Sequence, residues 1–244
     1  MFHFHPLPIR HRPPYLWAFL AVTIACRIWA QPEAAQGPPP DPPPLLAYQG
    51  RTIAQTMHYD GADWLVRDSR EREEDCQTML RSLGLKEGLA ICDMGCGNCF
   101  YTHQLAQIVG AQGRVYAVDI QPEMLHLLEL SRGTNEPKNV TVVLGSVSDP
   151  HLPTASLDMV LCVDVYHEFS HPIHMLAAIR KALKPTGRLV LVEFRAEDPE
   201  VPIKELHKMS KVQVRKELEP NGFRLVREFD ELPWQHVLFF EPTR

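Results

Sequence analysis

Short apolar runs alternate with amphipathic helical segments along residues 89–194, and this alternation strongly constrains the fold. The runs are rich in Val, Ile and Leu and lie at 89–94, 115–120, 140–144, 157–163 and 189–194. The helical segments between them lie at 100–109, 123–130 and 173–183. Nearly continuous apolar strands are buried on both faces, and their alternation with helices is typical of a parallel sheet covered on both sides. The pattern predicts a doubly wound α/β protein.

The chain departs from this alternation after residue 194. A helix is expected at 211–219, and two strands are expected at 223–229 and 234–240. So short a connection joins antiparallel neighbours, because parallel neighbours need a long crossover. The sequence therefore predicts a mostly parallel, seven-stranded sheet that ends in an antiparallel hairpin. One or two further helices are expected at 60–83, before the first strand.

The first part of the chain differs in composition from the rest. Residues 1–30 contain three arginines and no acid, with an eleven-residue apolar run that ends at Cys26. A basic start, a short apolar run and a small residue such as Ala30 are typical of a secretory signal. We therefore expect a signal peptide at 1–30, a Pro-rich linker at 31–58 and a folded domain at 59–244.

This N-terminal pattern bears on localisation. An apolar run of eleven residues is too short for a stable transmembrane helix. If the signal is real, the protein is exported to the periplasm, the cell envelope or the medium; otherwise it is cytoplasmic. The sequence does not decide whether Cys26 is lipidated, or what the oligomeric state is.

Charge and cysteine content exclude some functions. The net charge is −5, and residues 31–244 hold 22 basic against 30 acidic groups. So acidic a body is a poor polyanion binder, and no nucleic acid partner is expected. Without Cys26 there remain five cysteines, three of them within eight positions, and an odd, clustered set does not form a disulfide framework.

Glycines and carboxylates follow the first two expected strands of the folded domain. Asp93-x-Gly95-x-Gly97 leads from a strand into a helix, where glycine permits positive φ and close approach of a ligand. Asp119 ends the next strand, and a carboxylate there can accept both ribose hydroxyls of a nucleoside cofactor. Phe100 stands where a pyrophosphate-binding loop needs a third glycine. These residues indicate a nucleoside site and leave the nucleoside open.

Further motifs complete a resemblance. They are Leu144-Gly145-Ser146, Cys162-Val163-Asp164-Val165-Tyr166-His167 and Leu183-Lys184-Pro185-Thr186-Gly187-Arg188-Leu189. With the motifs above and the closing hairpin, they resemble the class I S-adenosylmethionine-dependent methyltransferases over about residues 75–242. The resemblance implies S-adenosyl-L-methionine as cofactor and methyl transfer to an unidentified small-molecule or protein acceptor. The family often has glycine where Cys99 stands, and commonly aspartate at the position of Ser146.

The same resemblance implies which residues contact the cofactor. They are Asp93, Gly95, Cys96, Gly97, Asp119, Ile120, Ser146, Val147 and Asp164. His167 is expected at the carboxyl end of the fourth strand, beside the cofactor pocket, and is the candidate general base. A structural role for this histidine fits the sequence equally well. His207 and Tyr59 lie in segments that could cover the site.

Three other functions compete for these residues. Cys96-Gly97-Asn98-Cys99 at a helix start matches the C-x-x-C of thiol oxidoreductases. His167-Glu168-Phe169-Ser170-His171 matches the H-E-x-x-H of zinc proteases, which needs both histidines on one continuous helix. Pro172 disfavours helical geometry at His171, so no metal site is expected. A non-catalytic domain that binds an adenosine ligand is the third alternative.

Overall fold

The computed structural model describes Met1, His3 and residues 41–131 and 137–243. The signal peptide expected at 1–30 lies outside the described residues, apart from Met1 and His3, and remains a prediction. A compact unit extends from Pro40 to the C-terminus. Among residues 41–131 and 137–243, no helix is both long and apolar enough to cross a membrane.

The second half of the expected linker packs on the folded unit. Strands β1 (Ala47–Tyr48) and β2 (Arg51–Thr52) form a small antiparallel ribbon. The Arg51 guanidinium, at 2.8 Å, forms a salt bridge with Glu217, whose side chain is fully buried. The backbone N–H of Ala54 donates to the carbonyl of His167 at 3.3 Å. The compact unit thus begins before residue 59, because these polar contacts tie residues 45–54 to it.

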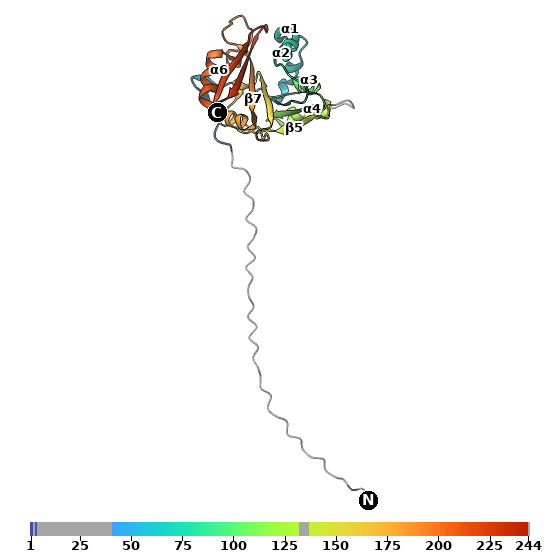
Figure 1. Ribbon diagram of the computed structural model, residues 1–244. Helices are drawn as coiled ribbons and strands as arrows, with labels where there is room; N and C mark the ends of the chain where they lie inside the picture. Colours follow the sequence, from blue (N-terminus) through green and yellow to red (C-terminus); the bar gives the residue numbers. More distant parts are fainter. Residues whose placement is uncertain (2, 4–40, 132–136, 244) are drawn as a thin grey trace. The chain divides into compact units, whose positions relative to one another are not determined.

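A mixed, eight-stranded sheet forms the centre of the unit (Figure 1). Its strands are β3 (Ala90–Met94), β4 (Arg114–Asp119), β5 (Val140–Leu144), β6 (Leu157–Val163), β7 (Leu183–Arg195), β8 (Lys208–Met209), β9 (Phe223–Phe229) and β10 (Gln235–Pro242). The order is β5-β4-β3-β6-β7-β10-β9, with β8 paired to β7. Strands β3 to β8 pair in parallel, whereas β10 runs antiparallel to both β7 and β9. The predicted parallel sheet with its antiparallel hairpin is confirmed, and β8 is an additional short strand.

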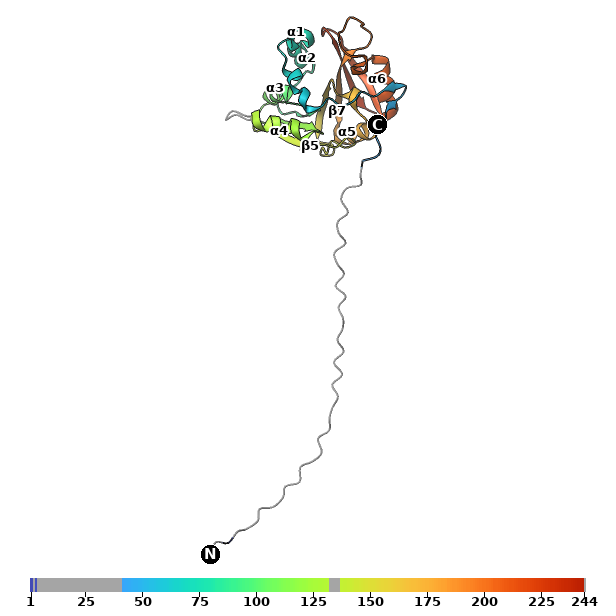
Figure 2. The same cartoon turned by 180° about the vertical axis from the view of Figure 1, so that it is seen from behind.

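Helices cover both faces of this sheet. They are η1 (Tyr59–Val66), α1 (Arg70–Glu74), α2 (Cys76–Ser82), α3 (Phe100–Val109), α4 (Pro122–Ser131), η2 (Tyr166–Glu168), α5 (Pro172–Ala182), η3 (Glu205–His207), α6 (Lys211–Leu218) and η4 (Glu219–Asn221). Helices α1 to α4 gather toward the β5 side and α6 lies toward the opposite side, as the front and back views both show (Figures 1 and 2).

Neighbouring residues of the central strands enter different cores. In β6, Val160 and Cys162 join the cluster that includes Leu176 of α5, whereas Leu161 joins the cluster that includes Leu105 of α3. All five of these side chains are fully buried. The continuous apolar runs of the sequence are therefore explained by burial of both strand faces.

Strand β7 is longer than the run at 189–194 suggested. Pro185-Thr186-Gly187, expected to separate helix from strand, lies inside β7, where the pairing with β6 shifts register between Leu157 and Met159. A Cβ at Gly187 would lie 2.6 Å from the carbonyl oxygen of Leu157. The turn-forming residues thus make an irregularity within the strand, because backbone passes so close that only glycine fits.

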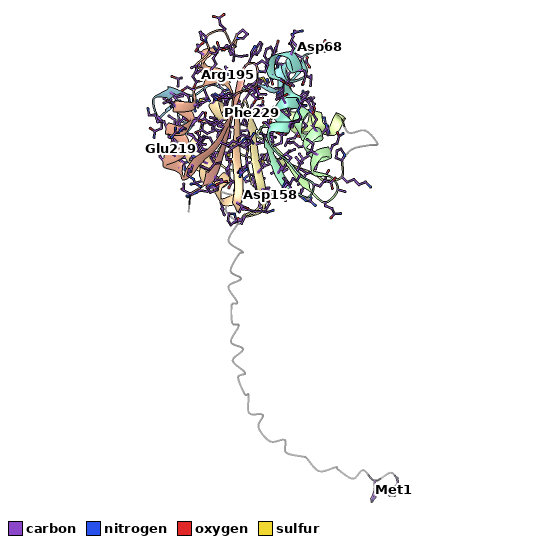
Figure 3. The ribbon with its side chains drawn as sticks, turned by 45° about the horizontal axis from the view of Figure 1, so that its top comes forward. Met1, Asp68, Asp158, Arg195, Glu219 and Phe229 are labelled. Carbon is purple, nitrogen blue, oxygen red and sulfur yellow. The ribbon has the colours of Figure 1, made fainter. Side chains whose placement is uncertain are left out.

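The parallel strands β3 to β7 all have their carboxyl ends at the same edge of the sheet. Figure 3 shows Arg195, at the carboxyl end of β7, and Asp158, near the start of β6, at opposite ends of the strands. Asp68, between η1 and α1, lies on the Arg195 side. Ligands of open α/β sheets bind outside the carboxyl ends of the strands, where the strand order reverses. That reversal falls here between β3 and β6.

Candidate active site

A cavity of about 460 Å³ opens at this reversal, which places it among typical ligand sites. Most of the site residues expected from the sequence line it, namely Gly95, Gly97, Asp119, Ile120, Ser146, Val147, Asp164 and His167. They come from the loops after β3, β4, β5 and β6, which the parallel sheet brings to one edge. Asp93 and Cys96 do not line the cavity.

The loop after β3 depends on two glycines with positive φ. Gly95 has φ of 67° and Gly97 has φ of 53°. A Cβ at Gly95 would lie 2.3 Å from Val165 Cγ2, and one at Gly97 would lie 2.5 Å from Leu65 Cδ1. Both positions therefore need glycine for their conformation, and Gly95 needs it also for space, because Val165 is a stiff β-branched side chain.

Asp119 holds this loop and also faces the cavity. Its Oδ2 accepts from the backbone N–H of Gly97 at 3.0 Å, and its Oδ1 accepts from that of Gln121 at 2.9 Å. Burial raises the pKa of the carboxyl group above its usual range. Two backbone donors thus orient a buried carboxylate toward a ligand.

Asp93 and Cys96 support the loop from behind. Asp93 is 3% exposed, and its Oδ2 accepts from the Thr102 hydroxyl at 2.6 Å. Burial raises the pKa of Asp93 to about 6. Cys96 packs with Cys99 in a small apolar cluster. Neither residue lines the cavity, so their contact with the cofactor stays a prediction.

The cysteine pair lacks the features of a redox centre. The sulfur atoms of Cys96 and Cys99 are 3.6 Å apart, and both residues are buried. The hydrogen bond between the thiols and their burial raise the pKa of Cys96. Reactive thiols are instead partly exposed and have a lowered pKa. The oxidoreductase alternative therefore finds no support in this geometry.

Asp164 contributes an unpaired oxygen to the cavity wall. Its backbone is left-handed, with φ of 52°, and its Oδ2 accepts from Gln235 Nε2 at 2.7 Å. Its Oδ1 is buried without a hydrogen-bond partner. Burial, together with the nearby Glu74 and Glu193, raises the pKa of Asp164. A buried acceptor without a partner and a strained backbone are both features of ligand sites.

His167 lines the cavity and is 1% exposed. Its Nδ1 lies 2.7 Å from Oε2 of Glu193, a fully buried residue of β7. Since a carboxylate accepts hydrogen bonds, this contact places the proton on Nδ1 and leaves the lone pair on Nε2. His207 Nδ1 lies 3.0 Å from that Nε2. Sequence reasoning had no signal for Glu193, which lies within an apolar strand.

Glu168, next to His167 in the chain, is hydrogen-bonded to the segment of residues 56–59. Its Oε1 accepts from the backbone N–H of Met57 at 3.1 Å, and burial raises its pKa to about 7. Gln121 donates from Nε2 to the carbonyl of Met57 and accepts from the backbone N–H of Tyr59, both at 2.9 Å. Residues 56–59 are thereby fastened along the cavity.

A cluster of charged side chains lines the cavity beside η1 and α1. Arg70 donates from Nε to Oε2 of Glu74 at 2.8 Å, and both side chains are almost fully buried. Arg67 also pairs with Glu74, and its guanidinium lies 3.8 Å from the ring centroid of Trp64. All four residues line the cavity. From the sequence, only one or two charged helices were predicted for this segment.

His171 is separated from His167, as Pro172 led us to expect. Helix α5 begins at Pro172, and His171 has the non-helical angles φ −128° and ψ 55°. Its Nδ1 lies 2.9 Å from the hydroxyl of Ser170, and its Nε2 contacts the carbonyl of Pro42. The two histidines of the H-E-x-x-H motif therefore do not share a helix face.

Comparison with known proteins assigns the family. A family model described as "Methyltransferase domain" matches residues 85–233. The chain is 33% identical over 115 residues to an uncharacterized 37.1 kDa protein in transposon TN4556 of Streptomyces fradiae, covering 47% of this chain and 33% of that protein. It is 27% identical over 145 residues to demethylmenaquinone methyltransferase of Lactococcus lactis, covering 59% and 56%.

A solved structure agrees with this assignment. The crystal structure of a SAM dependent methyltransferase from Aquifex aeolicus matches with a TM-score of 0.72 and 26% identity, covering 77% of this chain and 100% of that one. The chain therefore belongs to the methyltransferase domain family, with the class I S-adenosylmethionine-dependent fold. It spans a third to somewhat over half the length of the two curated relatives.

Proposed function

We propose that this protein transfers the methyl group of S-adenosyl-L-methionine to a small-molecule acceptor whose reacting atom lies beside His167. The observation that carries the proposal is that Gly95, Asp119 and Asp164 share one cavity with His167. Bound there, the cofactor supplies an electrophilic methyl group on a sulfonium sulfur. Family membership and the fold support the same chemistry.

The cavity wall offers a complementary group for each part of the cofactor. Asp119 keeps acceptor capacity beyond its two backbone bonds, which suits the ribose hydroxyls. The unpartnered Oδ1 of Asp164 suits the ammonium group of the methionine part. Ile120, Ser146 and Val147, farther along the wall, would contact the adenine.

His167 is the group that we assign to acceptor activation. The Glu193 carboxylate holds the ring through Nδ1 and directs the Nε2 lone pair away from itself. That lone pair can act on an acceptor O–H, N–H or S–H, and positioning supplies much of the remaining rate in a displacement of this kind.

Cavity size favours a small acceptor over a protein side chain. A volume of about 460 Å³ lies in the lower half of the range for small-molecule sites, and the cofactor itself would fill much of it. Thr56, Met57 and the loop with Pro202 and Ile203 also line the cavity. A polypeptide segment would have to displace them.

The proposal is tested in two steps. Titration calorimetry of the full chain should show binding of S-adenosylmethionine and of its demethylated product, and absence of binding would refute the proposal. A cell extract is then separated by size, and formation of demethylated cofactor is followed with each fraction. We expect turnover with the low-molecular-mass fraction, slowed by roughly 100-fold or more in His167→Ala. Binding with no turnover in any fraction would favour the non-catalytic alternative, and turnover with the protein fraction alone would refute the small acceptor.

A further inference from the structure

We propose that His167, Glu168 and His207 bind a divalent transition-metal ion at the acceptor end of the cavity. Each side chain offers one ligand atom, and all three residues line the cavity. His167 Nε2 lies 3.0 Å from His207 Nδ1. Glu168 Oε1 lies 3.9 Å from His167 Nε2 and 4.0 Å from His207 Nδ1.

The size of this triangle matches metal coordination. These three separations define a point in the plane of the atoms that lies about 2.1 Å from each of them, the length of Zn–N and Zn–O bonds. An ion at that point would contact all three atoms in one plane, and tetrahedral geometry, with ligand atoms about 3.4 Å apart, requires Glu168 Oε1 to move about half an ångström toward the two imidazoles. An arrangement of hydrogen bonds alone does not require Glu168 to lie equally far from both imidazoles.

The surroundings orient two of the ligands as metal sites require. Metal-bound histidines almost always donate their other ring N–H to a carboxylate or carbonyl, which fixes the tautomer. Glu193, fully buried, accepts from Nδ1 of His167 at 2.7 Å. The backbone N–H of Met57 donates to the proposed ligand oxygen of Glu168 at 3.1 Å.

The fold brings the third ligand from a distant part of the chain. His207 ends η3 and precedes β8, whose Lys208 pairs with Phe194 of β7. Glu193 is the residue before Phe194, so β8 places His207 beside the Glu193–His167 pair. Our expectation of no metal site considered only His171, and His207 supplies the ligand that His171 cannot.

The donor set indicates the class of ion. Imidazole nitrogens select zinc, iron, cobalt and related ions, whereas magnesium and calcium prefer oxygen alone. Two histidines and one carboxylate, with a position left for another molecule, are the protein ligands of catalytic zinc sites. The open position would face the cavity, which all three residues line.

This site rests on the proposed function, because it assigns the Nε2 lone pair of His167 to an ion that activates the acceptor. The ion would bind the acceptor's oxygen, nitrogen or sulfur and lower its pKa, so that its proton leaves to water. The acceptor's electron pair would then form the bond to the methyl carbon, while the carbon–sulfur bond breaks and its electrons stay on sulfur. His167 Nε2 cannot hold a metal ion and take this proton at once, so the ion replaces it as direct activator.

The test is metal titration of the full chain. His3, His5 and His11 near the N-terminus offer further imidazoles, so all samples carry alanine at these positions. After dialysis against a chelator, Co²⁺ is added and its visible absorption is recorded, followed by competition with Zn²⁺. We expect one Co²⁺ per chain. His207→Ala and Glu168→Gln should each lower Co²⁺ affinity by at least roughly 100-fold.

Controls separate this proposal from the proposed function. His174→Ala removes an exposed histidine of α5 and should leave Co²⁺ affinity unchanged. Calorimetry with S-adenosylmethionine is run on each variant, and normal cofactor binding shows that the variant is folded. A chain that binds the cofactor but neither Co²⁺ nor Zn²⁺, or that keeps its Co²⁺ affinity in His207→Ala, would overturn the metal site. One that binds Co²⁺ as expected but no cofactor would instead overturn the proposed function.

Discussion

Asp119→Ala should weaken S-adenosylmethionine binding by roughly ten- to hundredfold, and the expected size follows from the lone pairs of its carboxylate. An ionised carboxylate has about four acceptor positions. The backbone N–H groups of Gly97 and Gln121 occupy two of them, which leaves two for the two ribose hydroxyls. Loss of hydrogen bonds to a buried charged group costs about 1.5–3 kcal/mol, and each 1.4 kcal/mol is about tenfold in affinity.

Asp119→Asn sharpens this prediction. The substitution keeps the size of the side chain, but its amide group would face a backbone N–H of Gly97 or Gln121 with a second donor. We therefore expect cofactor affinity to fall about as far as in the alanine variant. Asp230→Asn changes an exposed carboxylate that pairs with Lys211 and is the matched control, with unchanged affinity.

The assay is calorimetric titration of each variant with S-adenosylmethionine and with its demethylated product. Both ligands carry the ribose, so both affinities should fall by a similar factor. Denaturant unfolding shows whether the variants remain folded at the titration temperature. If Asp119→Ala is folded and binds both ligands as tightly as the natural chain, the assignment of the ribose to Asp119 is wrong.

Three other predictions concern the loop, a buried acid and the N-terminus. Gly95→Ala should lower the free energy of unfolding by about 1–3 kcal/mol, because its φ is 67° and its Cβ would lie 2.3 Å from Val165. Denaturant unfolding should show partial recovery in a double variant with Val165→Ala, and full stability of Gly95→Ala would contradict the geometry. The pKa of Asp93, raised to about 6, means that the folded state binds this proton more tightly than the unfolded state, so the Asp93 contribution to stability should decline as pH rises from about 4 to about 6. Unfolding across this range should show that Asp93→Asn removes the decline, and an unchanged profile would contradict the shift. We also propose that the mature chain begins near Gln31, and mass spectrometry of protein from its native cell would refute this by finding Met1 retained.

Most of the architecture could be predicted from the sequence because strands that are buried on both faces are nearly continuous apolar runs. The range 100–109 became α3 and the range 140–144 became β5 with the same bounds. The predicted turn was wrong, because close approach of two backbone segments decides the structure there. Pro185-Thr186-Gly187 has the composition of a turn, yet Gly187 lets β7 pass the carbonyl of Leu157 at a register shift.

The candidate site was predictable where its residues follow strands directly. Gly95, Asp119 and Asp164 come at strand ends, and the carboxyl ends of parallel strands converge on one edge. Glu193 was missed because it lies inside β7, where one polar residue in an apolar run gives no hint of its direction. Tyr59 was expected in a segment that could cover the site, but the hydrogen bonds of this segment to Gln121 and Glu168 were not predictable because they depend on tertiary contacts.

The H-E-x-x-H motif shows how a correct local inference can still miss the chemistry of a site. Pro172 does keep His171 off a helix shared with His167, since α5 begins only at Pro172 and His171 has non-helical backbone angles. The partner of His167 is instead His207, forty residues farther along, at 3.0 Å. Its position depends on the parallel pairing of β8 with β7, which local sequence cannot reveal because β8 is only two residues long. If β8 were unpaired, His207 would lose its place beside Glu193 and His167, and the three proposed ligands would no longer converge. The metal proposal therefore depends on the pairing of this short strand as much as on the ligands themselves.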